Sequence, residues 1–296
     1  MAQRKIAWQS KLILLLIVPF AAAYTILQAH WWFTQAPSVA IWTLGLSLLL
    51  GIVVLWLRAA TPAAAFTGVV ITASLIFSTG TVPYQPWHTA LVPTLGVSLL
   101  AYIATRIGRN RKEKLGTAEK RHGREASQIA ANLGIAMLVS NDFFQSALAN
   151  TGLAVRLASA PGIFFVAALA ALAEAAADTV SSEIGQVLGG RPRIITTLRS
   201  ADPGTNGAIS LAGTLAGIAA AALIAAAGAW AVGGGLTSFS IACAGGVFGL
   251  LFDSLLGATF ERRTFLNNDA VNFISTASAA AFALALLTIL PEHLLP

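Results

Sequence analysis

Charged residues are scarce in this sequence. Asp, Glu, Lys and Arg make up 10% of its 296 residues, whereas hydrophobic residues make up 56%, and the mean hydropathy is +0.76. So few charges cannot cover the surface of a soluble domain of this size. The composition therefore excludes a water-soluble protein and predicts an integral membrane protein.

Residues that usually build catalytic clusters are also few. Cys243 is the single cysteine, so no disulfide can form within the chain, and the four histidines are scattered. Neither Gly-x-Ser-x-Gly nor His-Glu-x-x-His occurs. The basic segment 106–124 contains no aromatic residue on which a base could stack, and we therefore expect no nucleic-acid partner.

Apolar runs recur along the whole chain, each about 18 to 25 residues long and thus long enough to cross the membrane core as a helix. They are continuously apolar and rich in Ala and Leu, whereas the strands of a transmembrane barrel alternate apolar and polar residues. The sequence thus predicts an all-α polytopic transmembrane helical bundle of about nine helices. The runs lie near residues 12–29, 38–57, 62–80, 88–107, 126–147, 161–183, 208–232, 236–258 and 270–290.

The basic residues predict the orientation of this bundle. If nine helices alternate in direction and the N-terminus is cytoplasmic, 17 of the 18 Lys and Arg residues lie on the cytoplasmic side, and Arg156 is the exception. This asymmetry follows the positive-inside rule, and the C-terminus is then external. We expect a multi-pass protein of the cell (inner) membrane, surrounded by the lipid bilayer. The first run also resembles a cleaved signal peptide, but no soluble domain follows it.

Carboxylates interrupt the sixth run near its cytoplasmic end. The segment "AEAAADTVSSEIG" (173–185) contains Glu174, Asp178 and Glu183. On a helix Glu174 and Asp178 share one stripe, whereas Glu183 points elsewhere. Carboxylates at membrane depth are costly unless they are paired, metal-bound or hydrated. We therefore predict a site on this helix that faces the cytoplasm.

A further carboxylate, Asp253, lies near the cytoplasmic end of the eighth run. Gly246, Gly249 and Gly257 fall on the same helix face as Asp253. Such small residues let another helix approach closely. The pattern predicts that Asp253 faces protein rather than lipid.

Amide side chains mark two more helices on the same side. The ninth run begins with a polar stripe that contains Asn268 and Asn272. The fifth run opens with Arg124, Gln128 and Asn132 at a spacing of four, which places them on one face. We expect these helix ends to converge on one cytoplasmic site.

The loop before the seventh run has the composition of an anion site. It reads "GGRPRIITTLRSADPGTNGAIS" (189–210) and combines three arginines, including Arg191 and Arg193, with a Gly- and Thr-rich turn that leads into a helix. Free backbone N–H groups and the helix dipole attract a phosphate there, and arginines can bind it bidentately. An ordinary helix-capping loop explains the spacing equally well. The Gly-Lys-Ser/Thr ending of a Walker A motif is absent.

Taken together, these residues are the parts needed for magnesium-assisted phosphoryl transfer. Carboxylates suit a divalent metal, arginines and a glycine-rich helix start suit phosphate, and amides orient the ligand. In such reactions the protein mainly positions the phosphates and neutralises charge. We therefore expect Mg²⁺ as a cofactor and a phosphate-bearing ligand at this site.

Several motifs in this order resemble the integral-membrane family that includes the phytyl phosphate kinases. The resemblance covers about residues 50–290 and implies a membrane-embedded kinase-like domain over 41–296, with residues 1–40 as a possible added N-terminal transmembrane helix. The motifs are "KLGTAEKRHGREASQIAANLG" (114–134), "ADTVSSEIG" (177–185), "RIITT…PGTNGAIS" (193–210), "DSLLGA" (253–258) and "NNDAVNFIS" (267–275).

The resemblance implies an activity and roles for residues. Family members of known activity transfer a phosphoryl group from a nucleoside triphosphate, often CTP, to a prenyl monophosphate such as phytyl or geranylgeranyl phosphate. On this basis Asp178 and Asp253 are expected to ligate the metal, with Glu183 as a third catalytic residue. The expected ligands of the nucleotide or prenyl phosphate are Arg191, Arg193, Thr205, Asn206, Gly207, Asn268, Asn272 and Asn132.

Other interpretations of the same residues stay open. A transporter or lipid flippase could use the acids for ion coupling, and a structural assembly factor would need them only for stability. Asp178 or Asp253 could form a structural ion pair with Arg191 or Arg193. The sequence also leaves open the prenyl chain length, the choice between CTP and ATP, and the oligomeric state, including a homo-oligomer.

Overall fold

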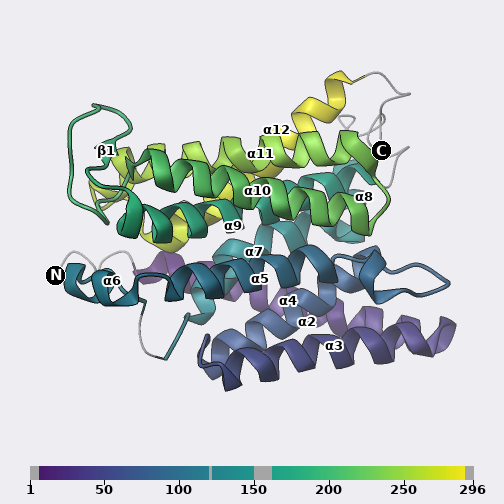
Figure 1. Ribbon diagram of the computed structural model, residues 1–296. Helices are drawn as coiled ribbons and strands as arrows, with labels where there is room; N and C mark the ends of the chain where they lie inside the picture. The colour runs from purple at the N-terminus through teal and green to yellow at the C-terminus, as the bar shows by residue number, and fades with distance from the viewer. Residues whose placement is uncertain (1–6, 120–121, 150–161, 291–296) are drawn as a thin grey trace.

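A computed structural model describes residues 7–119, 122–149 and 162–290, and over these residues the chain is an all-α bundle (Figure 1). Each of the nine apolar runs contains a helix, so the predicted fold class is confirmed. These helices are α2 (Ala7–Gln35), α3 (Pro37–Trp56), α4 (Pro62–Thr79), α5 (Leu91–Arg106), α7 (Ala126–Ser140), α9 (Gly162–Leu188), α10 (Leu211–Ala231), α11 (Gly235–Leu256) and α12 (Asn268–Ile289).

The count of nine membrane crossings is approximate. Seven of the described helices are long and apolar enough to span a membrane. Helix α5 forms an eighth candidate span only if it is counted together with α6 (Arg109–Leu115), and the two helices meet at a bend of 68°. Helix α7 is apolar but shorter than a full span. The remaining short elements are η1 (Pro86–His88), α8 (Asp142–Ala149), β1 (Arg193–Ile194), β2 (Ala208–Ile209) and the π-helical turn η2 (Gly257–Glu261).

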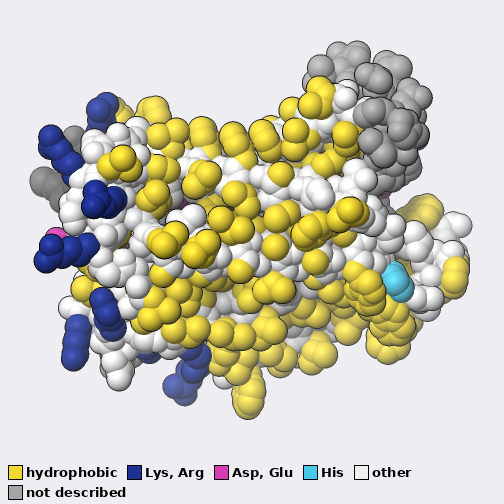
Figure 2. Space-filling model, turned by 45° about the horizontal axis from the view of Figure 1, so that its top comes forward, with side chains coloured by type: hydrophobic (Ala, Val, Ile, Leu, Met, Phe, Trp, Pro, Cys, Tyr) yellow, Lys and Arg dark blue, Asp and Glu magenta, His cyan; other side chains and the backbone are white. Residues whose placement is uncertain are grey.

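Basic side chains gather at one end of the bundle. Figure 2 shows Lys and Arg at the end where α6 and β1 lie in Figure 1, and a largely hydrophobic surface along the helices. This separation is what a helix bundle needs in order to keep charges out of the hydrocarbon region. The assignment of the basic end to the cytoplasm stays a prediction, and Arg156 and the C-terminal tail lie outside the described residues.

Helix α9 is the centre of the bundle. In its apolar window 94% of the residues are buried, more than in any other described span. Glycines on its neighbours allow this enclosure: a Cβ added to Gly246 of α11 would lie 2.8 Å from the Ala173 Cβ, and one added to Gly217 of α10 would lie 2.9 Å from the Ala177 carbonyl oxygen. The close helix packing expected from the glycine stripes is confirmed.

Helix α2 is tied to the start of α12 by polar contacts. The Gln9 Nε2 donates to the Phe265 carbonyl (2.8 Å), and the Asn267 backbone N–H donates to Gln9 Oε1 (2.8 Å). The Ser10 hydroxyl donates to Asp269 Oδ2 (2.6 Å). These bonds satisfy polar groups that would otherwise be unpaired near the membrane. The N-terminal helix therefore helps to position the end of α12 from which Asn268 and Asn272 project.

We predict that Gly246→Leu lowers the free energy of unfolding by about 1–3 kcal/mol or more, because the new side chain overlaps Ala173 at a backbone-to-backbone contact. Gly45→Leu is the matched control, since an added Cβ at exposed Gly45 meets no atom within 4 Å. Thermal unfolding of both variants in detergent checks this. Equal melting temperatures for the two variants would contradict the packing described for α9 and α11.

Candidate functional site

A polar cavity of about 350 Å³ opens among the ends of α7, α9, α11 and α12 and the segment 203–210. These five elements contain residues of the five motifs identified in the sequence. Of the predicted site residues, all except Arg191 and Arg193 line this cavity. Those that line it are Asn132, Asp178, Glu183, Thr205, Asn206, Gly207, Asp253, Asn268 and Asn272.

Asp178 of α9 and Asp253 of α11 form the acidic centre of the cavity. Their side chains are close enough to interact directly, and Glu174 and Glu261 lie near enough to act on one or both of them electrostatically. The Asp253 Oδ1 is buried and has no hydrogen-bond partner among the described residues. Neighbouring carboxylates repel one another, so a bound cation would stabilise this arrangement.

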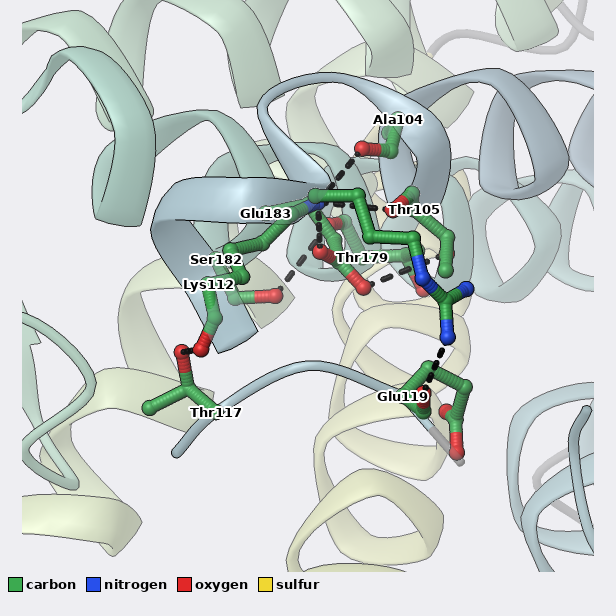
Figure 3. Close-up of polar contacts among 9 residues, drawn as sticks. Ala104, Thr105, Lys112, Thr117, Glu119, Thr179, Ser182 and Glu183 are labelled. Atoms are coloured by element: carbon green, nitrogen blue, oxygen red, sulfur yellow. Dashed lines mark hydrogen bonds and ion pairs between the residues drawn. The ribbon is translucent and has the colours of Figure 1, made fainter. Parts of the chain in front are cut away.

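Glu183 lines the same cavity but is already paired. Its Oε2 accepts a hydrogen bond from Lys112 Nζ at 2.6 Å, and its Oε1 accepts one from the Thr105 hydroxyl at 3.2 Å (Figure 3). Helix α9 continues to Leu188, so Glu183 points toward α5 and away from the face of Asp178. The pair links the bent end of α5 to α9.

Lys112 also terminates α5. Besides Glu183, its Nζ donates to the carbonyl oxygens of Ala104 (2.9 Å) and Thr105 (2.8 Å) in the last turn of the helix (Figure 3). The side chain is only 1% exposed. A buried ammonium with three acceptors is well satisfied, and it fixes the 68° bend between α5 and α6.

The segment 203–210 forms the outer wall of the cavity. Strand β1 pairs antiparallel with β2, with Ile194 opposite Ala208. Gly204 and Gly207 have φ of +87° and +71°, which side chains other than glycine rarely adopt. Gly207 lies against the backbone of Ala258, so this segment is held against η2. Ser210 then caps α10 by accepting a hydrogen bond from the Gly213 backbone N–H (3.1 Å).

The predicted amides from two helices contact one another. Asn272 Nδ2 of α12 donates to Asn132 Oδ1 of α7 at 2.8 Å, and both residues are buried. Each residue also lines the cavity, as does the more exposed Asn268 at the first turn of α12. The expectation that these helix ends converge is confirmed by their positions; their role as ligands stays a prediction.

Arginine placement differs from the sequence expectation. Arg191 and Arg193 are exposed and do not line the cavity, and the Arg193 guanidinium donates to the Leu198 carbonyl (3.0 Å). Pro192, between them, is buried and faces the cavity instead. Alternation along the extended chain turns both arginines outward. Neither forms an ion pair with Asp178 or Asp253 in the part of the chain that the structure describes.

Arg124 is the cation that the cavity does contain. It lies within electrostatic range of Asp178 and is the only Lys or Arg among the described lining residues. Its backbone N–H donates to the Ala59 carbonyl (3.0 Å), and its carbonyl accepts from the Thr61 N–H (3.0 Å). These two bonds hold the Arg124 backbone against the segment that joins α3 to α4. The helical stripe predicted Arg124 near the site, but not its place as the cation of the cavity.

Two other lining residues were not expected from the sequence. Gln186 contributes a buried Oε1 that has no hydrogen-bond partner among the described residues. Glu261 is the last residue of the π-helical turn η2, which follows α11. The i+8 spacing of Gln186 from Asp178 is a detectable helical signal. Glu261 gave no such signal because it stands beside Arg262 and Arg263, which are typical of a charged loop.

The cavity carboxylates suit Mg²⁺ better than a metal ion that needs three or more protein ligands. No group of three or more His, Cys, Asp and Glu side chains is arranged as a metal site within the described residues. Mg²⁺ is usually held by one or two carboxylates, with the remaining positions filled by phosphate oxygens and water. The Asp178–Asp253 pair, with its unpartnered Oδ1, is suited to that kind of site.

These features define a multi-pass α-helical membrane protein with an acidic polar cavity at its basic end. Residues 45–280 match the family model described as integral membrane protein DUF92. The chain belongs to this family, which confirms the resemblance indicated by its motifs. Helix α2 lies outside the matched region.

Three curated relatives illustrate the similarity. The uncharacterized membrane protein MJ0933 of Methanocaldococcus jannaschii is 44% identical over 36% of this chain and 45% of its own length. The uncharacterized membrane protein sll0875 of Synechocystis is 33% identical over 68% of this chain and 74% of its own. Protein VTE6, chloroplastic, of Arabidopsis thaliana is 29% identical over 70% and 62%. No solved structure matches the chain significantly.

We predict that Lys112→Met or Glu183→Leu alone destabilises the protein by about 3–5 kcal/mol, because each leaves a charge buried without its partner. The double variant should lose less than the sum of the two, since no lone charge stays behind. Unfolding of all four proteins in detergent measures this cycle. Strict additivity would show that the ion pair does not couple α6 to α9.

Proposed function

We propose that this protein is a membrane kinase that transfers a phosphoryl group from a nucleoside triphosphate, with CTP favoured, to a prenyl monophosphate. The observation that carries the proposal is the meeting of Asp178 and Asp253 with Arg124 in one polar cavity. Phosphoryl transfer needs a metal site and a phosphate site side by side. The resemblance of the motifs to the family that includes the phytyl phosphate kinases supports the choice of acceptor.

The cavity residues have distinct roles in this proposal. Asp178 and Asp253 would hold Mg²⁺, which would neutralise charge on the phosphates. Arg124 would bind the phosphate of the acceptor, and Thr205 and Asn206 would contact the nucleotide from the outer wall. In this proposal Glu183 supports the site by pairing with Lys112, which holds α9 in position. The family resemblance implied a catalytic role for Glu183.

The reaction requires no strong general base. A terminal oxygen of the prenyl monophosphate attacks the γ-phosphorus of the nucleoside triphosphate, and the bond from that phosphorus to the bridging oxygen of the β-phosphate breaks. The products are prenyl diphosphate and nucleoside diphosphate. The acceptor oxygen is already ionised, and no histidine lines the described cavity. The protein contributes position and charge, as the cavity residues can provide.

The alternative of a transporter or flippase has less support from the geometry. Transporter sites are typically near the membrane midplane, between broken helices. Here the cavity opens at the basic end, and α9 is continuous from Gly162 to Leu188. We propose that this end faces the cytoplasm, where nucleoside triphosphates are available.

We predict that Asp178→Asn and Asp253→Asn each lower kcat/KM for phosphoryl transfer at least ~100-fold, because either change removes a carboxylate that would hold the metal, and the metal would neutralise the phosphates. Purified protein in detergent would be assayed with phytyl or geranylgeranyl monophosphate, Mg²⁺ and each nucleoside triphosphate. Asp202→Asn is the control, since Asp202 is exposed at the same end and does not line the cavity.

The same assay separates the alternatives. Diphosphate formation that disappears in both cavity variants supports the kinase. No product from folded wild-type protein with any donor and acceptor would refute it. Retained transfer in Asp178→Asn and Asp253→Asn would instead refute the metal assignment.

Arg124→Gln should raise KM for the prenyl monophosphate about 10- to 100-fold, because it removes a charge-assisted contact to phosphate from the cavity. Arg263→Gln is the matched control, since Arg263 is exposed at the same end and lies outside the cavity. Steady-state kinetics with varied acceptor at saturating nucleotide measure the difference. A similar KM in both variants would remove Arg124 from the acceptor site.

A further inference from the structure

A second cavity adjoins the polar cavity and differs from it in character. Its volume is about 500 Å³, and its walls come from α3, α4, α5, α7 and α9. Many of its lining side chains are aliphatic, among them Val54, Val69, Val97 and Leu133. Such a space favours a hydrocarbon ligand.

The two cavities meet at a shared wall. Glu119, Arg124, Asn132 and Thr179 line both of them. Thr179 directly follows Asp178 in α9, so the meeting point lies beside the acidic pair. A ligand with its apolar part in the second cavity can therefore present a polar end to the proposed metal site.

Arginines surround the part of the second cavity that belongs to the basic end. Arg58, Arg106, Arg109 and Arg124 all line it. The Arg106 guanidinium donates to the Leu57 carbonyl at 3.1 Å, which ties the end of α5 to the end of α3. Glu113 and Glu119 line this cavity as well, and Glu113 is paired with Arg109 (3.0 Å). An anionic head group therefore fits beside the other cations, Arg58, Arg106 and Arg124, and a hydrocarbon tail fits the aliphatic walls further along the helices.

We propose that this second cavity, here called the tail cavity, holds the single hydrocarbon chain of the prenyl monophosphate, with the phosphate near Arg124. The identity of this ligand rests on the proposed kinase function. A monoester with one chain matches the geometry, because its terminal oxygens are free to enter the polar cavity. Phosphatidylglycerol has a diester there, and any two-chain phospholipid has a second tail to place.

Gly68 of α4 offers a direct way to fill the tail cavity. It lines the cavity, and the nearest atom to an added Cβ is the Ile129 Cγ2 at 4.0 Å. A leucine at this position therefore extends into the cavity without displacing backbone. Gly45 of α3 is the matched control, because it is exposed outside the cavity and an added Cβ there meets nothing within 4 Å.

The test is photolabelling of the full-length protein in nanodiscs with a C20 prenyl monophosphate that carries a diazirine on its chain. No nucleotide or turnover is needed. We expect label in peptides from α3, α4 and α5, displaced by unlabelled geranylgeranyl monophosphate. Gly68→Leu should reduce this labelling at least tenfold, whereas Gly45→Leu should leave it unchanged.

The outcomes separate the tail cavity from the kinase activity. If these helices are labelled and Gly68→Leu abolishes the labelling, the result supports the tail cavity even when no phosphoryl transfer is detected. In that case the proposed function alone fails. Equal labelling of both variants, or displacement by phosphatidylglycerol as effective as by the prenyl monophosphate, overturns the tail cavity even if the kinase is active.

Chain-length dependence gives a second readout in an active enzyme. Gly68→Leu should raise KM at least tenfold for the C20 acceptor but leave KM for a C5 prenyl monophosphate nearly unchanged, because the short chain does not reach the filled region. Ala101→Leu, which fills the same cavity from α5, replaces Gly68→Leu if that variant does not fold. An equal effect on both chain lengths would overturn the assignment.

Discussion

The enclosure of α9 by its neighbours is the constraint on which the rest of this structure depends. A helix made largely of alanine has little side-chain volume, so the surrounding helices can reach it only where glycines such as Gly217 and Gly246 allow close approach. Once enclosed, the helix has no contact with lipid or bulk water along most of its length. Polar groups on it must then be satisfied by other helices or by a ligand.

The carboxylates on α9 are stabilised in two different ways. Glu183 is satisfied within the protein, by Lys112 and Thr105, and this pairing ends α5 and fixes the turn into α6. Asp178 instead interacts with the Asp253 side chain, and Glu183 and Arg124 lie within electrostatic range of it. One acid therefore stabilises the scaffold, while the other faces the cavity in which we propose that a metal and phosphates bind.

The arrangement of the cavities follows from the same packing. Helices α10, α11 and α12 close one side of α9, and the polar cavity lies where their ends and the 203–210 segment leave it uncovered. On the opposite side, α4, α5 and α7 leave the tail cavity beside it. The shared residue Arg124 is anchored by backbone bonds to Ala59 and Thr61 at the junction between the two cavities.

The sequence by itself determined the membrane class, the positions of the helices and the helix faces on which Asp178, Asp253, Asn132 and Asn272 lie, because hydropathy and helical spacing are local properties. Tertiary structure alone decided that Arg193 points outward and that Lys112 is buried. Lys112 stands in a run of basic residues that look equivalent, and only the bend after α5 turns one of them inward. Partners between distant segments depend on how helices pack, and no local pattern encodes that.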